Sequence, residues 1–153
     1  MKIFIPIIAS IALLTVSCSH PKKTAKTVAT PVVQTQATLD GTWELEFIPF
    51  SNGSLDQLYP KRKPTITFNE ADGSFSTFTG CNTARGKLVK NAGTINFSGD
   101  MAMTKMLCQG DGEKVYLSYL KKINSYSISN EGTTLTFIQG DMALMSFHRL
   151  AAK

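Results

Sequence analysis

Two cysteines and one histidine are the side chains after residue 38 that could support covalent or metal chemistry. A cysteine beside a histidine can act as a nucleophile with its base, and the candidates are Cys81, Cys108 and His148. Their spacing does not support such a pair, and the chain has no G-x-S-x-G, P-loop or H-E-x-x-H motif. The sequence therefore predicts a protein that is not an enzyme and that holds no cofactor and no metal.

A third cysteine follows an apolar N-terminal segment. After a basic start, residues 3–17 carry no charge. This run is shorter than the roughly 20 residues of a membrane-spanning helix and is typical of a secretory signal. Its end, Leu14-Thr15-Val16-Ser17-Cys18, resembles the lipobox of bacterial lipoproteins, although Thr15 stands where Leu is usual. An ordinary signal peptide with an incidental cysteine, or an uncleaved anchor, is the alternative.

The lipobox resemblance implies a signal peptide over residues 1–17 and lipid attachment at Cys18. Acyl chains on that residue would hold the protein on a membrane, since two or more chains give stable anchoring. Ser19 follows the cysteine, where an Asp would indicate retention at the inner membrane. By resemblance, the protein is expected to be an outer-membrane lipoprotein of the cell envelope, with its domain in the periplasm.

Residues 18–38 are predicted to be the lipidated cysteine and a flexible tether. Residues 19–38 contain no aromatic, glycine or acidic residue, and too little apolar surface to offset the entropy of ordering. A coil of this length spans roughly 25 Å. Its three lysines either keep the tether solvated or touch anionic head groups.

The formal charge of +5 does not arise from residues 39–150. Residues 39–150 contain eleven basic and eleven acidic side chains. Nucleic-acid binding therefore loses its main electrostatic support. The cluster Lys61-Arg62-Lys63 lies between Pro60 and Pro64 in a predicted loop, without an aromatic stacking motif, so no nucleic-acid partner is expected.

Alternating apolar and polar residues predict several β-strands in residues 39–150. In the first of them, Trp43, Leu45 and Phe47 should share one face, with Glu44 and Glu46 on the other. Turn residues separate the strands at residues 69–73, 91–93, 130–132 and 140–141. The predicted strands are residues 42–47, 64–68, 74–79, 85–89, 94–97, 125–129, 133–138 and 142–149.

One segment has helical spacing. Asp111 is a candidate cap, Glu113 lies in the first turn, and Lys121 with Lys122 lies near the end, as the helix dipole favours. The apolar stripe of this helix is Tyr116, Leu117, Leu120 and Ile123. Several strands with one helix predict an α+β fold: a strongly curved antiparallel β-sheet, barrel-like, with one packed α-helix.

Four short motifs in a fixed order carry a resemblance. They are Gly41-Thr42-Trp43, then Gly80-Cys81-Asn82 with Gly86, then Thr104-Lys105-Met106-Leu107-Cys108, then Glu113, Tyr116 and Leu120. Their order and spacing resemble the META domain family, which includes the bacterial heat-shock lipoprotein HslJ. Leu107 stands where Ala is usual. The resemblance covers residues 39–150 and implies an antiparallel sheet wrapped around a helix.

The motif residues have simpler structural roles than binding roles. Gly80 and Asn82 tolerate positive φ and can shape a turn, and Thr104 can hydrogen-bond that turn or a strand end. Gly41, Trp43, Gly86 and Glu113 are likewise assigned structural roles within the family motifs. The methionines at 101, 103 and 106 suit either a core or an adaptable groove.

Cys81 and Cys108 remain as an even pair once Cys18 is acylated. In an oxidising envelope such a pair predicts a disulfide, which would contribute about 3–4 kcal/mol by the loop-entropy model. Two buried thiols are the alternative. A metal site is disfavoured because the spacing is long and only His148 could assist.

Two functions stay open at the level of sequence. The first is a non-catalytic META/HslJ-like lipoprotein that serves envelope stress tolerance or maintenance by contacting an envelope protein partner. The second is a carrier or sensor of a lipid or apolar ligand, by analogy with pilotin-like barrels, which needs an apolar cavity inside the sheet.

Overall fold

The computed structural model describes residues 37–50, 53–97 and 99–152. The predicted signal peptide, Cys18 and nearly all of the predicted tether lie outside the described residues. Within these residues, no helix is both long enough and apolar enough to cross a membrane.

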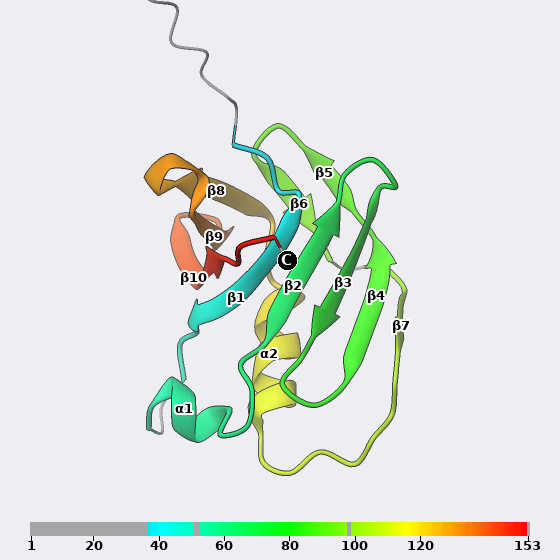
Figure 1. The fold of residues 1–153 in the computed structure, drawn as a ribbon, viewed down its shortest axis with the longest axis vertical. Helices are drawn as coiled ribbons and strands as arrows, with labels where there is room; N and C mark the ends of the chain where they lie inside the picture. The colour runs from blue at the N-terminus through cyan, green and yellow to red at the C-terminus, as the bar shows by residue number, and fades with distance from the viewer. Residues whose placement is uncertain (1–36, 51–52, 98, 153) are drawn as a thin grey trace, which may run out of the picture. The chain divides into compact units, whose positions relative to one another are not determined.

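One antiparallel sheet of ten strands forms the domain (Figure 1). In space the strands follow the order β5-β6-β8-β9-β10-β1-β2-β3-β4-β7. Their bounds are β1 Gly41–Phe47, β2 Thr65–Asn69, β3 Ser74–Phe78, β4 Thr83–Lys87, β5 Val89–Asn91, β6 Thr94–Asn96, β7 Met101–Met103, β8 Ser125–Ser129, β9 Thr134–Gln139 and β10 Met142–Arg149.

The sheet is strongly curled into a half-barrel. β5 forms one edge, whereas β4 lies beside the opposite edge strand, β7. Yet only Leu88 separates β4 from β5 along the chain, and its N–H donates to the carbonyl of Gly73 at 2.8 Å. The two sides of the sheet must therefore approach each other, which confirms the predicted curved antiparallel sheet.

Helix α2 (Gly112–Leu120) packs in the concave face of this sheet (Figure 1). Tyr116 and Leu120 are fully buried and Ile123 nearly so, which confirms the predicted stripe. The Tyr116 hydroxyl lies 2.7 Å from Thr77 Oγ1 on β3. Burial raises the pKa of this tyrosine above its ordinary value, so the phenol stays neutral and joins helix to sheet by a hydrogen bond.

Aromatic side chains fill the interior of the half-barrel. Phe97 packs against Phe75, Phe68 and Phe137, with ring centroids 5.0–6.4 Å apart. Phe137 in turn meets Phe147 at 5.0 Å. These rings come from β2, β3, β9 and β10 and from the residue that follows β6, so curling the sheet is what brings them together.

The prediction that Phe47 shares the inward face of β1 with Trp43 and Leu45 is wrong. Trp43 and Leu45 are fully buried, but Phe47 is 52% exposed. The register between β1 and β10 shifts between Leu45 and Phe47. Such a bulge inserts one residue and reverses the alternation that follows, so Ile48 is buried in place of Phe47.

Other boundaries also differ from the sequence-based expectation. The strand predicted over residues 85–89 is divided between β4 and β5, because the sheet curls at Leu88. A short helix that was not predicted, α1 (Leu55–Leu58), begins with a capping box between Ser54 and Gln57. Asp111 does occupy the N-cap position of α2, but its side chain makes no capping hydrogen bond.

Candidate functional site

Residues from three of the four family motifs converge on a buried amide at the end of the sheet where β3 and β4 meet. We call this cluster of Thr79, Asn82, Thr104, Cys108 and Glu113 the Asn82 hub. Asn82 is only 2% exposed. Its Oδ1 accepts from Thr104 Oγ1 and from the Met106 N–H, both at 2.8 Å. Its Nδ2 donates to Glu113 Oε1 at 3.0 Å and to the Met106 carbonyl at 3.2 Å.

The backbone N–H and carbonyl of Asn82 are also hydrogen-bonded. Its N–H donates to Glu113 Oε2 and to Thr79 Oγ1, each at 3.0 Å. Its carbonyl accepts from the Thr79 N–H at 2.8 Å. Glu113 therefore joins α2 to the turn between β3 and β4, a role that its position in the first helical turn did not reveal.

A disulfide joins Cys81 to Cys108, with the Cα atoms 5.8 Å apart and a sequence separation of 27. This confirms the predicted bridge. Asn82 Nδ2 lies 3.0 Å from Cys108 Sγ, so the bridge is part of the hub. The two sulfur atoms and a Glu113 oxygen lie within 4.8 Å of one another. In the disulfide neither sulfur is a thiolate, the form that binds metal, so the arrangement closes a loop and does not form a metal centre.

Gly80 is fixed by a tyrosine that the sequence did not single out. Gly80 has φ +97°, and a Cβ there would lie 2.6 Å from the ring of Tyr59. The same ring covers Gly112, whose carbonyl accepts from the Tyr59 hydroxyl at 2.8 Å. Burial raises the pKa of Tyr59. Tyr59 thus fills the space that two glycines leave open.

Thr104 and Gly86 also have structural roles. Thr104 Oγ1 accepts from the Thr83 N–H at 3.1 Å while it donates to Asn82, so the predicted contact between Thr104 and the turn is found. A Cβ on Gly86 would lie 3.0 Å from the ring of Phe75, which packs across it.

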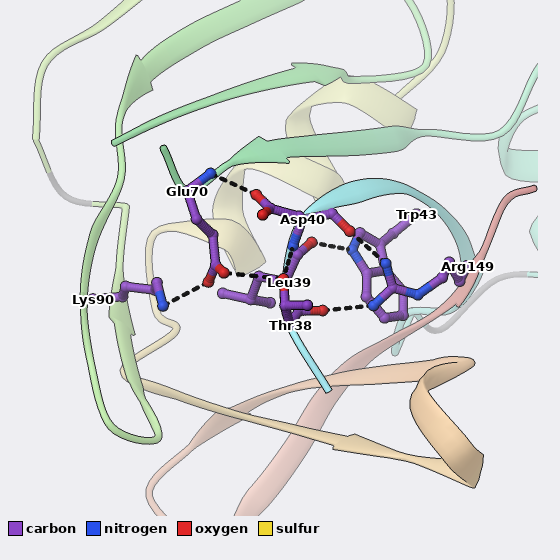
Figure 2. A network of polar contacts seen from close by, with 7 residues as sticks. All are labelled: Thr38, Leu39, Asp40, Trp43, Glu70, Lys90 and Arg149. Carbon is purple, nitrogen blue, oxygen red and sulfur yellow. Dashed lines mark hydrogen bonds and ion pairs between the residues drawn. The ribbon is translucent and has the colours of Figure 1, made fainter. Parts of the chain in front are cut away.

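A second polar network lies at the opposite end of the β2–β3 hairpin (Figure 2). We call it the Arg149 clamp; it consists of Thr38, Asp40, Trp43, Glu70, Lys90 and Arg149. Arg149 Nη2 donates to the Thr38 carbonyl at 2.5 Å, and Nη1 donates to the carbonyl of Asp40. The guanidinium lies 4.0 Å from the centroid of the Trp43 ring. Arg149 thereby holds the first residues of the domain against β1.

Glu70 completes the clamp. Its N–H donates to Asp40 Oδ1 at 2.6 Å, and its carboxylate accepts from Thr38 Oγ1 at 3.0 Å. Lys90 Nζ lies 2.5 Å from Glu70 Oε1. The hydrogen bond from Lys90 lowers the pKa of Glu70, and the same bond raises the pKa of Lys90.

Gly41 and Trp43 of the first motif belong to this clamp. Gly41 has φ +105°, and a Cβ there would lie 3.2 Å from Arg149 Nη1. Trp43 Nε1 donates to the Leu39 carbonyl at 2.8 Å. Sequence reasoning missed Glu70, Lys90 and Arg149, because no local pattern connects three charges so far apart in the chain.

His148 contacts two glutamates and neither cysteine in the contacts that the structure describes. Its Nδ1 is 3.2 Å from Glu46 Oε1, and its Nε2 is 3.9 Å from Glu44 Oε1. Cys81 and Cys108 are bonded to each other. The Cys–His pair considered from the sequence is therefore not formed among the residues that the structure describes.

Together these features define a class: a small antiparallel half-barrel domain, closed around one helix and pinned by a disulfide and an asparagine. The model of the META domain family matches residues 35–152. The chain belongs to the META domain family, as its four motifs predicted. Comparison with the curated proteins gives no match.

Solved structures share the fold. A protein from Burkholderia xenovorans, determined by NMR, is 23% identical with a TM-score of 0.58; the match covers 74% of this chain and 85% of that one. A DUF4847 family protein from Bacteroides vulgatus is 15% identical with a TM-score of 0.50, over 75% of this chain and 96% of that one. At these identities the likeness concerns the fold alone.

Proposed function

We propose that this chain is a non-catalytic lipoprotein of the cell envelope, attached to the outer membrane through acyl chains on Cys18. Its META domain would serve stress tolerance or maintenance of the envelope by contacting another envelope protein. The observation that carries the proposal is the use of the motif side chains: each polar atom of Asn82 has a partner inside the domain. The hub therefore stabilises the fold, and we assign the function to the exposed surface of the domain.

A surface suited to a protein contact surrounds Phe47. The bulge in β1 turns this ring outward, beside a groove of about 900 Å³ that Phe50, Val115 and Tyr119 also line. Exposed aromatic side chains around a hollow are frequent at the centres of protein interfaces. We call this surface the Phe47 groove.

The alternative, an apolar ligand inside the sheet, requires an internal cavity. The aromatic rings and the buried face of α2 occupy the described interior. This packing gives the carrier hypothesis no support.

The test has two parts. Intact mass of the protein extracted from membranes should show the diacyl modification and loss of residues 1–17; an unmodified Cys18 thiol would refute the anchoring. A photo-crosslinker at position 47 should capture a discrete envelope protein in cells under envelope stress. The matched control is position 142, since Met142 is 62% exposed elsewhere on the domain. Equal capture at both positions would refute the contact.

A further inference from the structure

Two apolar side chains project into water from the loop between β7 and α2. Leu107 is 100% exposed and Met106 is 61% exposed. Figure 1 shows this loop at the end of the domain opposite to residues 37–40. We call Met106 and Leu107, with the neighbouring Lys105, the Leu107 tip.

The tip is held rigidly despite its exposure. Asn82 accepts from the Met106 N–H and donates to the Met106 carbonyl. The next residue but one, Cys108, is tied to Cys81 by the disulfide. The hub and the disulfide thus fix the backbone on both sides of Leu107. Because that backbone is already ordered, less entropy is lost on binding.

Basic side chains surround the tip. Lys61 lines a groove of about 420 Å³ together with Met106, Leu107 and Phe78. The Arg62 guanidinium lies 4.5 Å from the centroid of the Phe78 ring. Lys105 precedes Met106 in the chain. This end of the domain therefore combines exposed apolar side chains with three cationic side chains, those of Lys61, Arg62 and Lys105.

The acidic groups nearby are largely occupied. Glu113 is turned into the Asn82 hub. Asp56 lies 3.3 Å from Lys63. Asp111 is exposed at the start of α2. The cations of Lys61, Arg62 and Lys105 thus outnumber the one carboxylate left free of a described partner.

We propose that the Leu107 tip inserts into an anionic lipid surface, with Lys61, Arg62 and Lys105 on the head groups. Protein hot spots favour Trp, Tyr and Arg seated in pockets and under-represent Leu. A fully exposed Leu beside Met and cations fits a membrane interface better, because lipid offers apolar depth and negative charge without a shaped cavity. The inference concerns the folded domain and holds whether or not Cys18 is acylated.

The experiment uses the chain from residue 19 onward. This chain retains the whole described core, the disulfide and both polar networks. Its binding is measured by co-sedimentation with vesicles of phosphatidylcholine plus phosphatidylglycerol, and with phosphatidylcholine alone. The double variant Met106→Glu/Leu107→Glu should bind the anionic vesicles at least about tenfold more weakly than the unaltered chain, because insertion is lost and negative charge is added.

The matched control is Val89→Glu/Met142→Glu, which places two charges at positions that are 61% and 62% exposed. It should bind like the unaltered chain. Lys61→Gln and Arg62→Gln should each weaken binding about fivefold, and added salt should weaken it further. The tether lysines are common to all variants, so differences report the domain.

Three results would overturn the proposal: equal loss in the tip and control variants, equal binding to neutral and anionic vesicles, or no binding of the unaltered chain to either. Far-ultraviolet circular dichroism and thermal unfolding of each variant separate loss of binding from loss of fold. If the Glu pair unfolds the domain, Leu107→Ser tests the same surface, since that side chain is fully exposed and its loss should cost the fold little. Intact mass at Cys18 decides the anchoring separately.

Discussion

The Asn82 hub and the Arg149 clamp solve the same problem at the two ends of the β2–β3 hairpin. Each uses one side chain to hold backbone groups of a segment distant in sequence. The hub does so with a neutral amide that is 2% exposed, closed by a disulfide. The clamp does so with charged groups whose side chains remain a quarter to a third exposed at Glu70 and Lys90. Burial and screening should therefore set how much each hydrogen bond contributes to stability, with more per bond in the hub than in the clamp.

Asn82→Ala should be the most damaging change. It removes the four hydrogen bonds that the Asn82 side chain makes to nitrogen and oxygen partners, as well as its contact with Cys108 Sγ, and leaves the Glu113 carboxylate short of a donor. At about 1 kcal/mol per bond the expected loss is about 3–4 kcal/mol. Denaturant unfolding of the oxidised protein measures it, with the exposed Asn91→Ala as control. A loss no greater than that of the control would remove the distinction between hub and clamp.

Loss of the disulfide through Cys81→Ala/Cys108→Ala should rank next. The bridge closes a loop with a sequence separation of 27, which the loop-entropy model equates with about 3–4 kcal/mol. Because Asn82 holds the same loop, the effects of removing the bridge and the amide should not add. A double-mutant cycle by denaturant unfolding measures the coupling. Strict additivity would mean that the hub is two independent devices.

Arg149→Gln should be milder, although it removes bonds to three carbonyls. Water can replace part of these contacts at an exposed site, so the expected loss is about 2 kcal/mol. Hydrogen exchange should show the loss confined to the backbone near residues 38–41. Arg85→Gln, at an exposed position on β4, is the control. Exchange that spreads to α2 would show that the clamp supports the whole core.

Glu70→Gln should have the smallest effect, about 0.5–1 kcal/mol at neutral pH, since solvent screens the pair with Lys90. The folded state lowers the pKa of Glu70 below its ordinary value of 4.5. The charged form is therefore favoured by folding, and its stabilisation is present above pH 4.5 and lost as pH falls through the folded value.

The measurement for Glu70 is the free energy of unfolding across acidic pH. The difference between the unaltered chain and Glu70→Gln should shrink as the solution is acidified. Glu131→Gln, at an exposed position, is the control. If the difference in free energy of unfolding stays constant down to the lowest pH, the charge of Glu70 does not contribute to stability.

Local patterns predicted much of the fold. Alternation located most strands, and the stripe at Tyr116 and Leu120 identified the helix, because both depend on residues close in sequence. The failures occurred where tertiary structure intervenes. A bulge reversed Phe47, and curling of the sheet divided the strand predicted over residues 85–89. Neither event has a local signature.

The motifs identified the site residues but not their connections. Cys81, Asn82, Thr104 and Glu113 were all singled out, and the disulfide was expected from the even count of cysteines. It was not foreseeable that the amide of Asn82 would bond both to residues 104–108 and to Glu113. The position of the Tyr59 ring against two glycines was not foreseeable either. Such contacts depend on which strand ends meet.

The sequence by itself determined the family, the curved antiparallel sheet with its packed helix, and the pairing of the two cysteines, because each follows from residue type and local order. Only the tertiary structure decided that Asn82, Thr104, Cys108 and Glu113 form one hub, that Arg149 clamps the start of the domain, and that Leu107 is left in water. These depend on packing between segments tens of residues apart, where burial and distance set the energy of a contact.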